Sequence, residues 1–114
     1  MTFERFAVLR VPYPFTDRAA EHNRPALVLS GALSFSTPSG HAVLAMITTA
    51  ANAPWPLDCA ISDLDAAGLP APSIVRLKLF TLDQRLVRGV LGHLARSDRQ
   101  RVALAMRSLL GEAA

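Results

Sequence analysis

The chain has 114 residues, 51% of them hydrophobic and 18% charged, which is enough for a single compact core and excludes a disordered chain. No apolar stretch approaches the roughly 20 residues of a membrane-spanning helix, and the amino-terminal segment lacks the long apolar core of a secretory signal. The formal net charge is +3, and the one cysteine, Cys59, excludes an internal disulfide, so we expect a single cytoplasmic domain over residues 1–114.

Short apolar runs bounded by proline and polar residues predict a mainly β chain. The predicted strands cover residues 7–11, 26–29, 42–48, 58–61, 73–79 and 85–94. Loops are expected where Gly, Pro, Ser and Asp accumulate, at residues 31–40, 50–56 and 62–72. Two glycines in the last strand, Gly89 and Gly92, indicate a bend or a bulge there.

The hydrophobic period changes near the carboxyl end of the chain. Val102, Met106 and Leu109 recur at helical spacing, and Ser97 begins a capping-box pattern, so we predict a helix over residues 98–110. Five or six short strands followed by one helix suggest a small, strongly bent antiparallel barrel on which the helix packs.

The segment that joins the first two strands carries the most informative residues. Pro25 is expected to open the second strand and to hold the preceding Arg24 in extended geometry. A guanidinium is then fixed where a polar loop meets a rigid sheet, and binding or catalytic groups are frequent at such places. Taken alone, Arg24 fits a surface ion pair with Asp17 or Glu21 better than a catalytic role.

The cationic charge is concentrated in the last third of the chain. Residues 1–75 hold four arginines against six acidic residues, and residues 76–114 hold seven arginines and one lysine against three acidic residues. Arginine suits bidentate contacts with phosphate, and a basic face is typical of nucleic-acid binding. Arginine-rich codon usage and an ordinary solvated helix face explain the same counts, so charge alone does not identify a partner.

The sequence offers no metal-binding or cofactor-binding motif. Its three histidines are far apart and have no Cys or carboxylate neighbours at ligand spacing. A phosphate-cradling glycine loop and a nucleophile elbow are also missing. Any reaction is therefore expected to proceed without a metal or a cofactor.

Five short motifs follow one another in a fixed order along the chain. They are PYPFTD with RPALVLS (12–17, 24–30), MITT (46–49), AGL with SIVR (67–69, 73–76), TLD (81–83) and VLGHL (90–94). Together they resemble the PemK/MazF-like toxin family, small ribonucleases of bacterial toxin–antitoxin pairs, over residues 7–110. The resemblance implies an SH3-like antiparallel barrel that dimerises, metal-independent cleavage of single-stranded RNA at short sequences by 2′-hydroxyl attack, and a cognate antitoxin as partner.

The resemblance also implies a catalytic pair, the arginine of the Arg-Pro motif and the threonine that closes the third strand, here Arg24 and Thr48. Arg24 would neutralise the scissile phosphate, since its pKa is too high for ready proton acceptance. Thr48 would hydrogen-bond a phosphate oxygen or the attacking hydroxyl, although without the motif it is an ordinary strand former. Polar, cationic and aromatic residues are the further expected RNA contacts: Thr16, Asp17, Arg18, Thr49, Trp55, Ser73, Arg76 and Lys78.

Two positions depart from the family pattern. Members that use an arginine at the place of Arg76 have a carboxylate two residues later, where this chain has Lys78, so one candidate general base is missing. The first strand starts with Phe6 and Ala7, where the family usually has Gly-Asp. Two alternatives therefore remain: a catalytically weakened module that binds RNA or a partner, and a gyrase inhibitor of the CcdB type. The second is less favoured, because the chain lacks the carboxyl-terminal tryptophan of that type.

Overall fold

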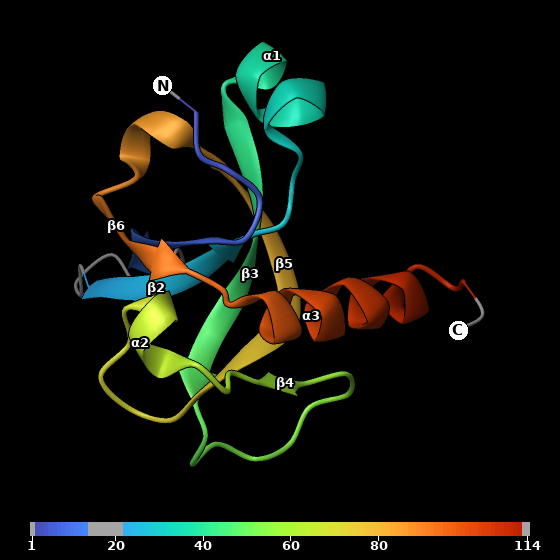
Figure 1. The fold of residues 1–114 in the computed structure, drawn as a ribbon. Coiled ribbons are helices and arrows are strands. Elements are labelled where there is room, and N and C mark those ends of the chain that lie inside the picture. Colours follow the sequence, from blue (N-terminus) through green and yellow to red (C-terminus); the bar gives the residue numbers. More distant parts are fainter. Residues whose placement is uncertain (1, 14–21, 113–114) are drawn as a thin grey trace.

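The computed structural model describes residues 2–13 and 22–112, so the predicted RNA contacts Thr16, Asp17 and Arg18 lie outside the described residues. Within these ranges a six-stranded antiparallel sheet has the order β4-β5-β3-β2-β1-β6, and a C-terminal helix crosses it (Figure 1). The elements in chain order are β1 (Ala7–Tyr13), β2 (His22–Val28), a π-helical turn (Ala32–Ser36), α1 (Thr37–Ser39), β3 (His41–Thr49), β4 (Cys59–Ala60), α2 (Leu64–Ala67), β5 (Ser73–Asp83), a 3-10 turn (Gln84–Leu86), β6 (Gly89–His93) and α3 (Arg96–Leu109).

The sheet curls and buries apolar side chains on both of its faces. Consecutive strand residues such as Val8 and Leu9 belong to different cores, because they point to opposite faces. The helix-side core is covered by α3 and contains Val8, Leu27, Ala45, Ile47, Val75, Leu77, Val102 and Ala105 among others. The far-side core contains Ala7, Leu9, Val11, Ala26, Val28, Ala42, Leu44 and Leu82. The predicted mainly β fold with a packed C-terminal helix is confirmed.

Some predicted boundaries are wrong, because tertiary contacts move them. Residues 31–40, expected to be a loop, form two helical turns that end at Gly40, whose φ is 73°. The helix α3 begins at Arg96 and not at a capping box on Ser97. Its first turn carries Asp98, whose carboxylate accepts hydrogen bonds from the separate segment 62–63, so a contact distant in sequence stabilises the start of this helix.

Two strands contain irregularities that alter which side chains are buried. The pairing of β3 with β5 slips next to Ala45, where β5 has two extra residues, Leu77 and Lys78. In a regular strand Arg76 and Lys78 would share one face and a similar exposure, but here Arg76 is buried between buried apolar neighbours, whereas Lys78 is exposed. In β6 the pairing with β1 skips Leu91, so the bulge that the glycines predicted is confirmed.

The strand β6 packs closely against α2 at Gly92. A Cβ atom on Gly92 would lie 2.3 Å from the carbonyl oxygen of Ala66 and 2.6 Å from the carbonyl carbon of Ala67. Since these are backbone atoms, α2 would have to move, and we expect Gly92→Ala to lower the free energy of unfolding by about 1–3 kcal/mol.

Urea denaturation of Gly92→Ala beside Gly40→Ala checks this expectation. A Cβ on Gly40 meets no atom within 4 Å, but its φ is 73°, so this control measures backbone strain alone. If Gly92→Ala lowers the free energy of unfolding no more than Gly40→Ala does, the expected clash with α2 is contradicted.

Candidate active site

The strand register places the two predicted catalytic residues on one face of the sheet. Ala26 of β2 pairs with Met46 of β3, and paired residues share a face, as do residues two positions apart in a strand. Arg24 and Thr48 therefore lie on the same face of the sheet as the far-side core, just beyond its last apolar side chains. The strand β2 begins earlier than predicted, at His22, so Arg24 lies within the strand instead of at its start.

Arg24 and Thr48 also line one hollow of about 270 Å³. The side chain of Arg24 is exposed and that of Thr48 is half-buried, so both groups are accessible to a substrate. The other residues that line this hollow are Pro25, Ile47, Thr49, Asn52 and Ser73. The structure thus brings the predicted pair together with two of the predicted RNA contacts, Thr49 and Ser73.

Asn52 is a site residue that the sequence did not indicate. It follows β3 in the loop 50–58, and its Nδ2 donates a hydrogen bond to Oγ1 of Thr48. A hydroxyl that accepts through one lone pair keeps its own proton for another acceptor. The Thr48 hydroxyl can therefore donate to an oxygen in the hollow. No sequence motif marks Asn52, because it is one polar residue in a polar loop. Its contact with Thr48 forms only when the loop folds.

Arg76 binds the loop 50–58. Its Nε and Nη2 donate to the two carboxylate oxygens of Asp58 at 3.1 and 2.9 Å, and Nη2 also donates to the carbonyl oxygen of Ala53 at 2.6 Å. The Arg76 hydrogen bonds hold the pKa of Asp58 below its usual value, and the pKa of Arg76 is raised by the same contact. The RNA contact of Arg76 stays a prediction, and it competes with this internal ion pair.

Trp55 and Lys78, two other predicted RNA contacts, lie against each other. The Nζ atom of Lys78 lies 4.4 Å from the centre of the indole ring, in the geometry of a cation–π interaction. Trp55 is still 43% exposed, so part of the indole ring is open to solvent. The structure therefore presents an aromatic ring and a cation together on the surface of the loop 50–58.

A larger hollow, of about 430 Å³, lies at the opposite end of β3, around His41. Its main charges, Asp83 and Arg85, neutralise each other in an ion pair of 2.7 Å. The hydrogen bond from Arg85 lowers the pKa of Asp83 to about 2. We assign the site to the smaller hollow, because it brings an arginine and a hydroxyl together.

The part of the chain that the structure describes gives no sign of metal chemistry or of a reactive thiol. No three His, Cys, Asp or Glu side chains are grouped there so as to hold a metal ion. Cys59 packs against the helix-side core, and burial raises the pKa of its thiol, which makes it a poor nucleophile. None of the helices in residues 2–13 and 22–112 is long and apolar enough to cross a membrane.

Solved structures with the same fold come from toxin–antitoxin systems. An endoribonuclease in complex with its cognate antitoxin, from a mycobacterial species, shares 17% sequence identity at a TM-score of 0.75, over 99% of this chain and 97% of that one. A MazE–MazF structure from Deinococcus radiodurans shares 18% sequence identity at a TM-score of 0.76, over 99% of this chain and 100% of that one. The Mycobacterium tuberculosis toxin MazF-mt6 shares 18% sequence identity at a TM-score of 0.72, over 95% of this chain and 99% of that one. At these identities the likeness shows the fold, and it confirms the predicted small barrel of the PemK/MazF type.

Comparisons of sequence give a second, independent result. No curated protein matches this sequence significantly. A family model, described as the PemK-like, MazF-like toxin of type II toxin–antitoxin systems, matches residues 4–110. Because that match spans nearly the whole sequence and agrees with the fold, the chain belongs to the PemK-like, MazF-like toxins of type II toxin–antitoxin systems.

Proposed function

We propose that the protein is a metal-independent endoribonuclease toxin that cleaves single-stranded RNA in the cytoplasm. The observation that carries the proposal is the shared hollow of Arg24 and Thr48. Family membership and the fold of a mycobacterial endoribonuclease bound to its antitoxin support it. By the same support, the protein acts as a homodimer, and a cognate antitoxin neutralises it by occupying the RNA-binding face.

The proposed reaction uses the substrate's own nucleophile. The 2′-hydroxyl oxygen attacks the adjacent phosphorus, the bond to the 5′-oxygen breaks, and the products are a 2′,3′-cyclic phosphate and a 5′-hydroxyl. Charge accumulates on the phosphate oxygens in the transition state. Arg24 can neutralise this charge with its guanidinium, and the Thr48 hydroxyl, held by Asn52, can donate to a phosphate oxygen.

The reaction also needs two proton transfers, one from the 2′-hydroxyl and one to the leaving 5′-oxygen. The described residues that line the hollow include no carboxylate and no histidine. We propose that water takes the proton of the 2′-hydroxyl and that another water protonates the leaving 5′-oxygen. The protein's contribution is then mainly electrostatic stabilisation and orientation.

The test is incubation of the purified protein with single-stranded RNA in the presence of EDTA. We expect fragments that carry a 2′,3′-cyclic phosphate and a 5′-hydroxyl. The main alternative is a weakened RNA-binding or partner-binding module, favoured by Lys78 at a carboxylate position, and it predicts intact RNA that is still bound. Trapped gyrase–DNA complexes would instead support a gyrase inhibitor.

Substitutions at Thr48 test the role of the hydroxyl. Thr48→Val keeps the shape but removes the donor, and we expect cleavage to slow by roughly 100-fold or more, as for the loss of one oxyanion-hole donor. Thr48→Ser keeps the donor and should stay within about tenfold of the wild-type rate. Thr81→Val, an exposed position towards the other end of β5, is the matched control. Wild-type activity in Thr48→Val would show that the hydroxyl takes no part in the chemistry.

A further inference from the structure

The loop 50–58 is held in one conformation by contacts that cross it. Both carboxylate oxygens of Asp58 bind Arg76, and one of them also accepts the backbone N–H of Trp55 at 2.9 Å. The backbone N–H of Asp58 in turn donates to the carbonyl oxygen of Trp55 at 3.2 Å. Arg76 is only 9% exposed, so the loop is tied to a buried group of the sheet.

The backbone next to Trp55 is constrained as well. Trp55 lies between Pro54 and Pro56, and a proline restricts both itself and the residue before it. Residues 55–58 form a tight turn in which Leu57 has a φ of 66°, a left-handed conformation that is costly for a branched side chain. Such strain persists only where the surroundings impose it, and it is frequent at ligand-binding sites.

The constrained loop presents Trp55 near the catalytic hollow. Asn52 lines the hollow and binds Thr48, and Trp55 is three residues further along, so the two Cα atoms lie within about 11 Å of each other. A single strand of RNA that passes through the hollow can therefore reach the indole ring within a few nucleotides.

We infer that Trp55 and Lys78 form a stacking subsite for an unpaired RNA base that neighbours the scissile link, and that Asp58 and Arg76 position it. The inference rests on the proposed binding of single-stranded RNA. Lys78 covers part of the ring, and the base stacks on the part that stays open. The ammonium group then lies where it attracts the phosphate of the same nucleotide. Stacking on an aromatic ring accepts every base, so this subsite adds affinity more than sequence choice.

Arg76 and Lys78 thereby divide two tasks within one strand. Arg76 lies before the two-residue bulge of β5 and points its charge at Asp58, whereas Lys78 lies in the bulge and stays exposed. A carboxylate in place of Lys78 would repel the phosphate and remove the cation–π contact. The departure from the family pattern at this position therefore fits a binding role in this chain.

Trp55 is the one tryptophan of the sequence, so tryptophan fluorescence reports on this subsite alone. The probe is a short single-stranded RNA with a 2′-O-methyl group on every ribose, which lacks the attacking hydroxyl and cannot be cleaved. Titration of the whole protein should quench the fluorescence saturably. Trp55→Ala, measured by anisotropy of a labelled probe, should weaken binding by roughly 5- to 150-fold.

The matched control is Phe35→Ala. Phe35 is a similarly exposed aromatic residue, 37% accessible, and it lies next to α1, at the opposite end of β3 from the loop 50–58 (Figure 1). We expect the Phe35→Ala variant to bind the probe with the affinity of the wild type. Lys78→Gln should weaken binding and reduce its salt dependence, because one phosphate contact is lost.

Asp58→Asn tests the positioning pair. The variant should raise KM for cleavable RNA and leave kcat unchanged, and it should make Trp55 of the free protein more accessible to acrylamide. A purely structural role of Asp58 would instead lower the amount of active enzyme, which appears as a lower kcat.

Three results would overturn the inference. They are the lack of saturable binding of the probe, binding without any change in Trp55 fluorescence, and unchanged affinity in Trp55→Ala. Dissociation of the oligomer in Trp55→Ala together with unchanged affinity would assign the ring to a contact between protein chains. Quenching of the Trp55 fluorescence without cleavage of ordinary RNA would refute the proposed function and keep the subsite. Cleavage of ordinary RNA without quenching would refute the subsite and keep the proposed function.

Discussion

Replacing Arg24 by alanine is expected to lower the rate of RNA cleavage by at least 100-fold. The guanidinium lines the same hollow as Thr48 and can neutralise the phosphate in the transition state. Loss of one group that stabilises such charge costs roughly 3–4 kcal/mol, which corresponds to a rate factor between about 100 and 1,000. The measurement is kcat/KM on an end-labelled single-stranded RNA in EDTA.

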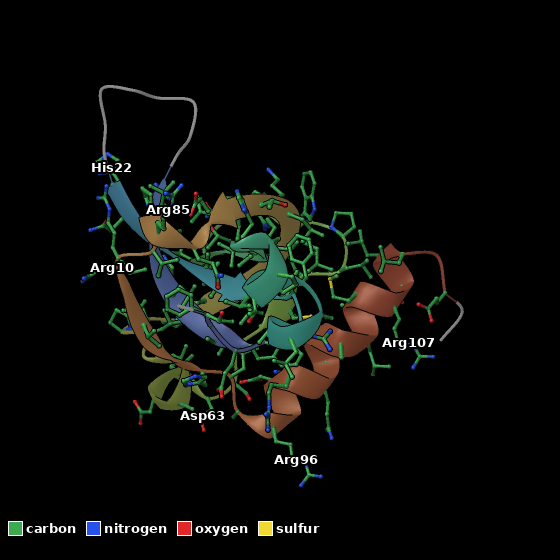
Figure 2. The ribbon with its side chains drawn as sticks, turned by 90° about the horizontal axis from the view of Figure 1, so that it is seen from above. Arg10, His22, Asp63, Arg85, Arg96 and Arg107 are labelled. Atoms are coloured by element: carbon green, nitrogen blue, oxygen red, sulfur yellow. The ribbon has the colours of Figure 1, made fainter. Side chains whose placement is uncertain are left out.

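Two further variants separate the causes of that loss. Arg24→Lys keeps the charge but not the bidentate geometry, so its rate should lie between those of the wild type and Arg24→Ala. Arg107→Ala removes an exposed arginine from α3, on the opposite side of the molecule from the start of β2 at His22 (Figure 2), and should cleave like the wild type. A rate for Arg24→Ala within tenfold of the wild-type rate would remove Arg24 from the mechanism.

The second large effect is expected at Asp98, in the first turn of α3. Asp98 is 1% exposed, and its carboxylate accepts hydrogen bonds from the backbone N–H groups of Ser62 and Asp63, from the Ser62 hydroxyl and from Arg101. Asp98→Ala would leave these donors without their acceptor and detach the helix start from the segment 62–63. We expect the free energy of unfolding to fall by about 3 kcal/mol, measured by urea denaturation.

The same carboxylate makes stability depend on pH. Burial raises the pKa of Asp98, but the hydrogen bonds from Ser62, Asp63 and Arg101 outweigh it and hold this pKa below its usual value. A pKa lowered by folding stabilises the protein above the unfolded pKa of about 3.9, and that stability is lost as pH falls through the folded value. The wild type should therefore lose stability below about pH 4, and Asp98→Asn should show a flatter acid limb.

Asp65→Asn is the control for this comparison. Asp65 is an exposed carboxylate on α2, close in sequence to the segment that Asp98 binds. We expect its unfolding curve to match that of the wild type within about 0.5 kcal/mol. Equal stability of Asp98→Asn and the wild type near neutral pH would show that the buried carboxylate does not hold α3 in place.

Local patterns in the sequence were sufficient for the fold class, and they singled out the proposed catalytic pair. The apolar runs predicted the strands and the 3.6-residue period predicted the helix, because both depend on which side chains a single element turns to the core. Arg24 could be singled out because Pro25 restricts its backbone. Thr48 was found through its motif, and the register of β2 and β3 then placed both residues in one hollow.

Only the tertiary structure decided the remaining parts of the site. Asn52 meets Thr48 and Asp58 meets Arg76 because the loop after β3 folds back over the sheet, and no local pattern encodes that path. The bulge in β5 that buries Arg76 and exposes Lys78 likewise depends on pairing with a strand about 30 residues away. Short-range sterics and hydrophobic periodicity depend on residues that are neighbours in the sequence. A hydrogen bond between distant segments, in contrast, exists only once the whole chain has folded.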